Sequence, residues 1–559
     1  MKKIYVLLTA IGFFLILLAG CVSQKQDLTS ALQSIKAEEL SQNVAVLASD
    51  EFEGRGPCSP GEEKTVNFLR DKFKKLGLKP GNGQSFFQEV PMVAITSDPG
   101  PKLEVKSENN STTFSYGPEF MAWTLQVKKE VSLADSDMIF VGYGIVAPEY
   151  NWNDYQGLDV KGKTVVMLVN DPGFATKDPQ LFKGRAMTYY GRWTYKFEEA
   201  ARQGAAAAFI IHETEPAAYP WEVVKNSWSG ENFHLITKDN NMSRCAVEGW
   251  LHLEAARQIF NMAGLDYEHL KSSASTRGFK AIPLKLKASI GLKNSIRQAT
   301  SRNVIALWPG SKRADEYIFY MAHWDHFGRD PSLEGDQIFN GAVDNATGSA
   351  ALIELAEAFT KLPKRPLRST VFLAVTGEEQ GLLGSAYYAT HPIYPLTKTV
   401  AAINMDALNV YGQMKDITVI GYGNSELDDY IEEAAAQQGR RVRPDPTPEK
   451  GSFFRSDHFS FAKQGVPALY TSGGLDHVKY GEEWTRAKKE EYLKEKYHKP
   501  TDEFDPNWDL SGAVDDLRLL FKIGYKLSME STFPTWKEGS EFKAKREADM
   551  AQAANHEEN

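Results

Sequence analysis

A short polar run, Tyr320 to Gly328 (YMAHWDHFG), follows an apolar stretch that is typical of a core strand. It places His323, Asp325 and His326 within four consecutive positions. Imidazole and carboxylate groups are costly to bury unless they are paired or bind a metal ion. The residue types therefore indicate acid–base or metal chemistry, and the partners of these side chains must come from elsewhere in the chain.

Further carboxylates lie where other predicted strands end or meet a helix. In a parallel sheet the carboxyl ends of the strands meet at one edge, where ligands bind. We therefore expect His323 and these four carboxylates to gather at that edge. They are Glu378 and Glu379 after VFLAVTG, Asp406 at the end of AAINMD, and Asp344 in NGAVDNATGSAAL.

So many carboxylates in one place would repel one another and take up protons unless positive charge lay among them. Two divalent cations would supply that charge. Carboxylate and imidazole ligands suit zinc or another first-row divalent metal, and the lack of thiolates argues against a structural zinc site. The sequence thus predicts a catalytic centre for two Zn²⁺ ions, and another divalent metal would also suit these ligands.

The elements that position these residues alternate between apolar strands and amphipathic helices from about Asn303 to Thr532. This pattern predicts an α/β fold with a mostly parallel sheet sandwiched by helices. The predicted strands include EYIFYMAH, STVFLAVTG, TVAAINMDAL, DITVIGYG and VPALYTSG, and the predicted helices include ATGSAALIELAEAFTKL and SELDDYIEEAAAQQG.

Five motifs in a fixed order resemble those of the M28 family of co-catalytic zinc aminopeptidases. The resemblance implies a zinc aminopeptidase-like fold and an exopeptidase that removes N-terminal residues from peptides. The motifs are HWD (323–325), DNATG (344–348), GEEQGLLGS (377–385), NMD (404–406) and YHKPTD (497–502).

The resemblance also implies which residues would hold the metal ions. Asp344 would bridge the two ions. His323 and Asp406 would complete the ligands of one ion, and Glu379 and His498 those of the other.

Two further roles follow from the same resemblance. Asp325 would orient the ring of His323, as carboxylates beside metal-binding histidines commonly do. Glu378 would act as the general base that takes a proton from a metal-bridging water.

Other polar residues near these motifs are less clearly assigned. We interpret His326 as a residue next to the ligands or at the rim of the site. His477 competes with His498 for the last ligand position, and the YHKPTD context favours His498. Asp457 and His458 lie before a predicted strand, where a helix-capping role for Asp457 is an equally good explanation.

The middle of the chain resembles the protease-associated domain that some M28 proteins carry as an insert. It could screen substrates as a lid or simply stabilise the enzyme. The predicted organisation is a lipoprotein signal peptide (1–20), a tether (21–29), the first part of the peptidase domain (30–99), the inserted β-rich α/β domain (100–285), the metal-binding part (286–535) and a charged, mobile tail (536–559).

The N-terminal segment MKKIYVLLTAIGFFLILLAGC has a positive start, a short apolar run and a cysteine in a lipobox-like context. It predicts an exported lipoprotein anchored to a membrane through lipid on Cys21 and facing the periplasm or the cell exterior. The outer membrane is the expected site in a diderm organism. Cys58 and Cys245 form a disulfide or remain two free thiols, and both alternatives stay open.

Composition and net charge limit the kinds of molecule that the protein is expected to bind. The chain has 559 residues, a net charge of -9 and 42% hydrophobic residues, which indicates a globular protein of two or more domains. This charge gives no basis for nucleic-acid binding, and peptides are the expected substrates. A carboxypeptidase or dipeptidase with the same metal site remains an alternative, as does a noncatalytic binding module; the oligomeric state stays open.

Overall fold

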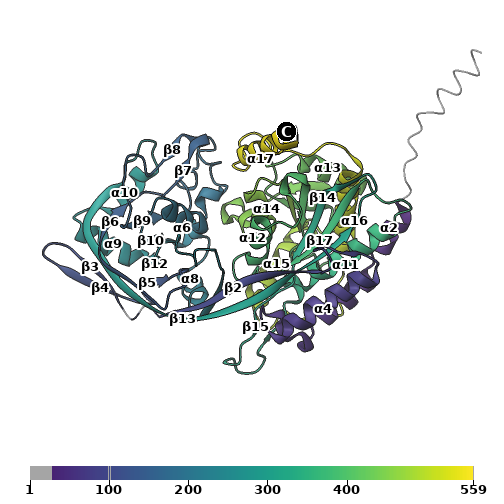
Figure 1. Cartoon of the computed structure of the whole chain (residues 1–559), viewed down its shortest axis with the longest axis horizontal. Coiled ribbons are helices and arrows are strands. Elements are labelled where there is room, and N and C mark those ends of the chain that lie inside the picture. Colours follow the sequence, from purple (N-terminus) through teal and green to yellow (C-terminus); the bar gives the residue numbers. More distant parts are fainter. Residues whose placement is uncertain (1–27, 99, 101, 558–559) are drawn as a thin grey trace, which may run out of the picture.

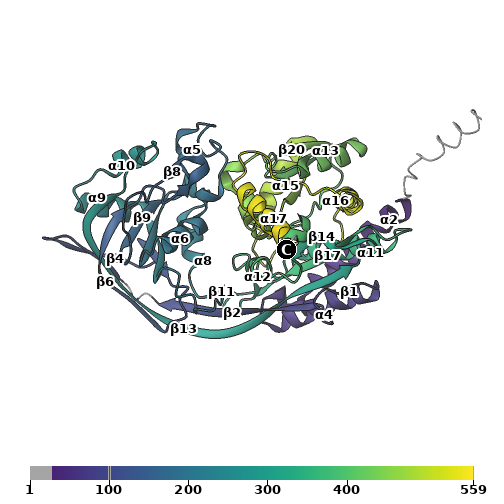
Figure 2. The same ribbon diagram turned by 45° about the horizontal axis from the view of Figure 1, so that its top comes forward.

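The computed structural model describes residues 28–98, 100 and 102–557 (Figure 1). Two α/β lobes lie side by side, and the antiparallel strands β2 (Phe87–Asp98) and β13 (Ile282–Trp308) run along both of them (Figures 1 and 2). We call the elements between these two strands the inserted lobe. The elements before β2 and after β13 form the main lobe.

The main lobe is built on a sheet in which the central strands β17, β14, β18 and β21 are parallel. Antiparallel strands flank them at β13 and β19. The predicted class, a mostly parallel sheet covered by helices, is confirmed. The strands, in spatial order between β13 and the far edge, are β17 (Arg368–Val375), β14 (Arg313–His323), β18 (Thr399–Asn404), β21 (Ala468–Gly473), β19 (Asp416–Ile420) and β20 (Arg441–Pro444).

Strand β14 shows why helices cover both faces of this sheet. Its buried side chains alternate, so that Ile318, Tyr320 and Ala322 belong to one hydrophobic cluster while Phe319 and Met321 belong to another. This is the two-residue period of a strand that is buried on both sides. The covering helices are α4 (Pro60–Lys75), α11 (Thr347–Thr360) and α16 (Ser511–Met529) on the first face, and α12 (Leu383–Thr390) and α14 (His458–Lys463) on the second.

The inserted lobe has its own sheet and its own core. Helices on its two faces pack in separate hydrophobic clusters. Its parallel strands are β6 (Glu130–Phe140), β9 (Thr164–Leu168), β10 (Ala207–His212) and β12 (Val247–His252), with β5 (Phe120–Trp123) antiparallel at the edge; its helices are α6 (Trp193–Arg202) and α8 (Trp221–Ser227) on one face and α9 (Leu253–Met262) and α10 (Tyr267–Ala274) on the other.

The structure differs from the sequence expectations at two points. The expected boundary at residue 285 falls inside β13, because this single strand pairs with β6 of the inserted lobe and then with β17 of the main lobe. The charged C-terminal segment is not a mobile tail. It forms α17 (Lys543–Glu557), and buried Arg546 fixes it by donating hydrogen bonds to the carbonyl groups of Leu396 and Thr399.

The predicted signal peptide and Cys21 lie outside the described residues. Within the described ranges, no helix has both the length and the apolar character needed to cross a membrane. The two remaining cysteines are not bonded to each other: Cys58 is partly buried and Cys245 is buried, each as a free thiol.

Candidate metal centre

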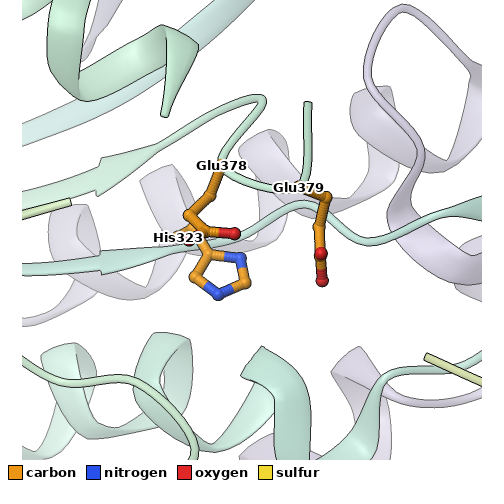
Figure 3. Close-up of side chains that lie close together, drawn as sticks. All are labelled: His323, Glu378 and Glu379. Carbon is orange, nitrogen blue, oxygen red and sulfur yellow. The ribbon is translucent and has the colours of Figure 1, made fainter. Parts of the chain in front are cut away.

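The predicted site residues meet at the carboxyl edge of the main sheet. His323 is the last residue of β14, and Glu378 and Glu379 lie in the turn that follows β17. Asp406 follows β18, and Asp344 lies in the turn that leads into α11. Figure 3 shows that His323, Glu378 and Glu379 project into the same space, and their ligand atoms lie within 4.8 Å of one another.

A first group of atoms that could hold a metal ion surrounds His323. Its Nε2 lies 3.2 Å from Oδ1 of Asp344 and 3.2 Å from Oδ1 of Asp406. The ring is 1% exposed, so the two carboxylates meet it away from bulk water. These three residues offer one nitrogen and two oxygen donors to a single cation.

A second group shares Asp344 with the first and is centred on Glu379. The Nε2 of His498 lies 3.3 Å from Oδ2 of Asp344 and 3.2 Å from Oε2 of Glu379. The Nδ1 of His326 lies 2.7 Å from Oε1 of the same glutamate. Asp344 therefore presents one oxygen to each group, as a residue between two cations must.

The structure places His326 next to the ligands, the first of the two interpretations, and not at the rim. Its ring is 1% exposed and contacts Glu379, and its Nε2 has no hydrogen-bond partner among the described residues. Two imidazoles thus adjoin Glu379. His477 is placed away from them, where its Nδ1 accepts hydrogen bonds from the backbone of Lys479 and Tyr480.

The charge balance of this site fits divalent cations. Within the described residues, the only basic groups in ion-pair distance of Asp344, Glu379 and Asp406 are histidines. Arg55 is fully buried nearby, but it donates its hydrogen bonds to backbone carbonyl groups, among them those of Trp324 and Gly341. The carboxylates are in excess, and the nitrogen and oxygen donors without thiolates suit zinc.

The same crowding alters the acid–base properties of the site. Burial raises the pKa of Glu378 well above the usual carboxylate value, and the nearby negative charges of Glu379 and Asp406 raise it further. Burial alone would lower the pKa of His323, but the charges of Glu378 and Asp406 raise it well above its ordinary value. Without added cations, this edge of the sheet retains protons on some of its side chains.

Asp325 holds the glutamate turn. Its carboxylate accepts hydrogen bonds from the backbone N–H groups of Glu378 (3.1 Å) and Glu379 (3.3 Å). The Nδ1 of His323 lies 3.1 Å from the backbone oxygen of Asp325 and 3.8 Å from its carboxylate. The backbone oxygen is therefore the closer acceptor for the ring, and the carboxylate fixes the two glutamates.

The turn around Asp344 is fixed by two neighbouring side chains. Asp502 accepts hydrogen bonds from the backbone N–H groups of Val343 and Asp344, each at 3.2 Å. Asn345 accepts from the N–H of Gly348 at 2.8 Å, and a Cβ at Gly348 would lie 2.3 Å from the Asn345 side chain. The glycine of the DNATG motif is thus required by the close approach of this turn to α11.

Sequence reasoning did not select three residues that adjoin the site. Ser456 donates its hydroxyl to Oδ2 of Asp406 at 2.7 Å. Asp457, which was left open, is fully buried, and neither of its carboxylate oxygens accepts a hydrogen bond from the residues that the structure describes. Tyr470 lies in β21, where burial and the charge of Asp406 raise its pKa. The residues RSDH (455–458) gave the only sequence signal for Ser456 and Asp457. Tyr470 gave no signal, because it resembles any other residue of a buried strand.

Comparison with known proteins agrees with this geometry. Residues 303–521, which hold every predicted ligand, match the model of peptidase family M28. This segment belongs to peptidase family M28. The predicted family is therefore confirmed for this segment, which is less than half of the chain.

Individual relatives match the M28 domain and its surroundings over different lengths. A glutamate carboxypeptidase 2 homolog of Caenorhabditis elegans is 27% identical over 400 residues, which cover 62% of this chain and 47% of that protein. Aminopeptidase NAALADL1 of Mus musculus is 30% identical over 131 residues, covering 22% of this chain and 16% of its own length. The matches thus span less than half of either relative.

Among solved structures, an aminopeptidase from Aneurinibacillus sp. strain AM-1 is similar to this chain with a TM-score of 0.49 and 19% sequence identity. The similarity covers 91% of this chain and 97% of that one.

Proposed function

We propose that this protein is a zinc-dependent exopeptidase that removes N-terminal residues from peptides. The observation that carries the proposal is the pair of donor groups that share Asp344, one with His323 and Asp406 and the other with Glu379 and a histidine. The M28 domain supports the same reaction class. His326 and His498 both adjoin Asp344 and Glu379. We assign the last ligand to His498, because its Nε2 lies in ion-pair distance of both carboxylates, whereas His326 has such a contact with Glu379.

Two divalent ions bound there would lower the pKa of water and polarise the carbonyl of the scissile bond. Side chains of this protein would carry out the proton transfer and hold the reacting groups in place. Glu378 lies beside His323 and forms no ion pair within the described residues. Cations bound nearby would lower its raised pKa, so that its carboxylate would take a proton from the attacking water and pass it to the leaving amine. Asp325 keeps Glu378 and Glu379 in place through their backbone N–H groups.

A carboxypeptidase or dipeptidase activity with the same metal site is the second candidate. The similarity to a glutamate carboxypeptidase 2 homolog over 400 residues favours it. A noncatalytic binding module is disfavoured, because every residue of the predicted ligand set is present and brought together at one edge of the sheet.

Two further parts of the proposal rest on the sequence. The segment 100–285 is proposed to be a protease-associated domain, on the basis of its strand–helix–strand pattern. The N-terminal segment is proposed to direct export and to anchor the protein through lipid on Cys21.

A panel of peptides tests the proposed function. Purified protein loaded with zinc is incubated with peptides that carry a free or an acetylated α-amino group, with and without a chelator. An aminopeptidase cleaves only the free-amine peptides and loses activity on chelation. Cleavage of the acetylated peptides from their C-terminal end supports the second candidate, and activity that survives complete metal removal contradicts both.

A further inference from the structure

His326 lies at the metal centre in a slot that encloses its ring. Its backbone N–H donates to the carbonyl group of Arg55 at 3.3 Å, and the residue is 1% exposed. A Cβ at Gly341 would lie 2.6 Å from Cγ and Cδ2 of the imidazole, so the ring occupies the space beside this glycine. The ring is therefore held in one position next to the predicted ligands.

The distances around Glu379 separate two kinds of neighbour. Ligands of one tetrahedral zinc ion lie about 3.3 Å apart, because each bond to nitrogen or oxygen is about 2.0 Å long. The Nε2 of His498 lies 3.2 Å from Oε2 of Glu379 and 3.3 Å from Oδ2 of Asp344, as ligands of one ion do. The Nδ1 of His326 lies 2.7 Å from Oε1 of Glu379, which is too short for two such ligands and is the length of a charge-assisted hydrogen bond.

The direction of this hydrogen bond follows from the chemistry of the two groups. An ionised carboxylate only accepts hydrogen bonds, so Nδ1 of His326 must carry the proton and donate it to Oε1 of Glu379. The Nε2 of His326 has no hydrogen-bond partner among the described residues. A neutral imidazole with its proton on Nδ1 leaves no buried N–H group without an acceptor, which agrees with this assignment.

The two oxygens of Glu379 therefore face different partners. Oε1 accepts from His326, while Oε2 stays directed toward His498. The backbone of the same residue is fixed separately, because its N–H donates to Asp325 at 3.3 Å. Without the imidazole, the carboxylate of Glu379 would keep its place in the turn but lose the contact that decides which oxygen faces the cation.

We propose that His326 is a positioning residue that holds Glu379 in the orientation needed to bind a cation through Oε2. The proposal rests on the proposed metal centre and adds to it a residue that is not in the predicted ligand set. Hydrogen-bond partners of metal ligands typically contribute 10- to 100-fold in metal affinity. The cation shared by Glu379 and His498 should thus depend on the hydrogen bond from His326 and not on the imidazole as such.

Substitutions of His326 can separate the hydrogen bond from the ring. His326→Asn places an amide N–H where Nδ1 lies, so Oε1 of Glu379 keeps a donor. His326→Leu has an apolar side chain of moderate size and no donor, and His326→Ala serves the same purpose if leucine disturbs folding. The exposed His391 of the main lobe provides the control variant His391→Leu.

Zinc retention measures the effect without peptide turnover. Each zinc-loaded protein is mixed with increasing concentrations of a chromophoric chelator, and the zinc that remains on the chain is counted. His326→Asn and His391→Leu should retain both ions as the unsubstituted protein does. His326→Leu should lose one of its two ions at a free zinc concentration about 10- to 100-fold higher. Full retention in His326→Leu, or an equal loss in His326→Asn, would overturn the proposal.

The visible absorption of the cobalt(II)-loaded protein tests whether His326 is itself a ligand. A positioning role predicts the same absorption bands for the unsubstituted protein and His326→Asn, because the atoms bound to the metal are the same in both. Different bands would show that the imidazole binds the ion directly, which contradicts the proposal. If no peptide is cleaved, the proposed peptidase function fails, while both metal measurements still decide the role of His326.

Discussion

The two lobes bury charge in different ways. Each has parallel strands with carboxylates beyond their ends: Asp344 and Glu379 in the main lobe, and Asp171 after β9 in the inserted lobe. Asp171 accepts hydrogen bonds from Thr188, and the charge of the fully buried Lys196 stabilises its ionised form. Within the described residues, Asp344 and Glu379 have only imidazoles in ion-pair distance. The inserted lobe thus carries its own counter-charge, whereas the proposed metal centre of the main lobe would take its counter-charge from bound cations.

The largest effect should come from Glu378→Gln. The amide cannot accept the proton from water, so kcat for peptide hydrolysis should fall by about 10²- to 10⁴-fold. Because Glu378 is not assigned as a ligand, metal analysis after dialysis should still find two ions per chain. Glu357→Gln, on the same lobe but paired with Lys361 on the surface of α11, serves as the control with normal activity. Loss of metal from Glu378→Gln would instead make this residue a ligand.

Asp344→Asn should abolish or strongly reduce the stabilisation of the main lobe by zinc. A thousandfold excess of zinc over its Kd stabilises a folded protein by about 4 kcal/mol. Thermal unfolding of the unsubstituted protein should therefore shift upward with zinc, and the shift should be lost or strongly reduced in Asp344→Asn. A zinc response of full size in this variant would contradict the shared position of Asp344 between the two donor groups.

Lys196→Met tests the other half of the comparison. Burial raises the pKa of Asp154 and Asp171 and lowers that of Lys196, whose Nζ donates to the carbonyl groups of Tyr143 and Asn170. Removing this cation leaves the buried carboxylates without counter-charge and should cost ~3 kcal/mol of stability, measured by urea unfolding. Zinc should not restore it.

The exposed Lys161→Met provides the matched control for this substitution and should unfold like the unsubstituted protein. A Lys196→Met protein of normal stability would show that the inserted lobe tolerates its carboxylates without an internal cation.

Glu354→Gln should show a third way to bury a carboxylate, which is to keep its proton. Glu354 is 1% exposed in α11, no cation of the described residues lies in ion-pair distance of it, and burial raises its pKa to about 8. The folded state therefore binds a proton that the unfolded state releases near pH 4.5. The stability from the protonated group is complete below that pH and is lost as the pH rises through about 8.

At ~1.4 kcal/mol per pKa unit, partly offset by water entry, Glu354→Gln should be ~2 kcal/mol more stable than the unsubstituted protein above pH 9 and similar to it near pH 5. Thermal unfolding between these pH values measures the difference. Parallel pH curves for the two proteins would show that Glu354 is ionised in the folded state.

Much of the main lobe could be predicted from its sequence because strand and helix periods are strong there. The apolar run that ends at His323 forms β14, and the helix pattern after Asp344 forms α11. The ligand motifs lie at the ends of these elements, so their meeting at one sheet edge followed from topology.

The remaining features depend on contacts that no local pattern records. His326 and His498 lie far apart in the sequence, and only the distances to Glu379 show that both imidazoles adjoin it. The ion pairs between the lobes join residues that are far apart in the chain, such as Glu198 and Lys463. The alternating pattern around residue 285 marks a strand, but it does not show that β13 continues into the main sheet.

The length of the paired strands β2 and β13 determines how the two lobes are aligned with each other. A strand advances ~3.3 Å per residue, so two residues added to both strands between the lobes would move one lobe ~7 Å along the other without unpairing the ribbon. The metal centre would survive, because all its ligands belong to the main lobe. The ion pairs that join the lobes, Lys183 with Glu541 and Lys463 with Glu198, would lose their register, so the length of this ribbon sets which contacts form between the two lobes.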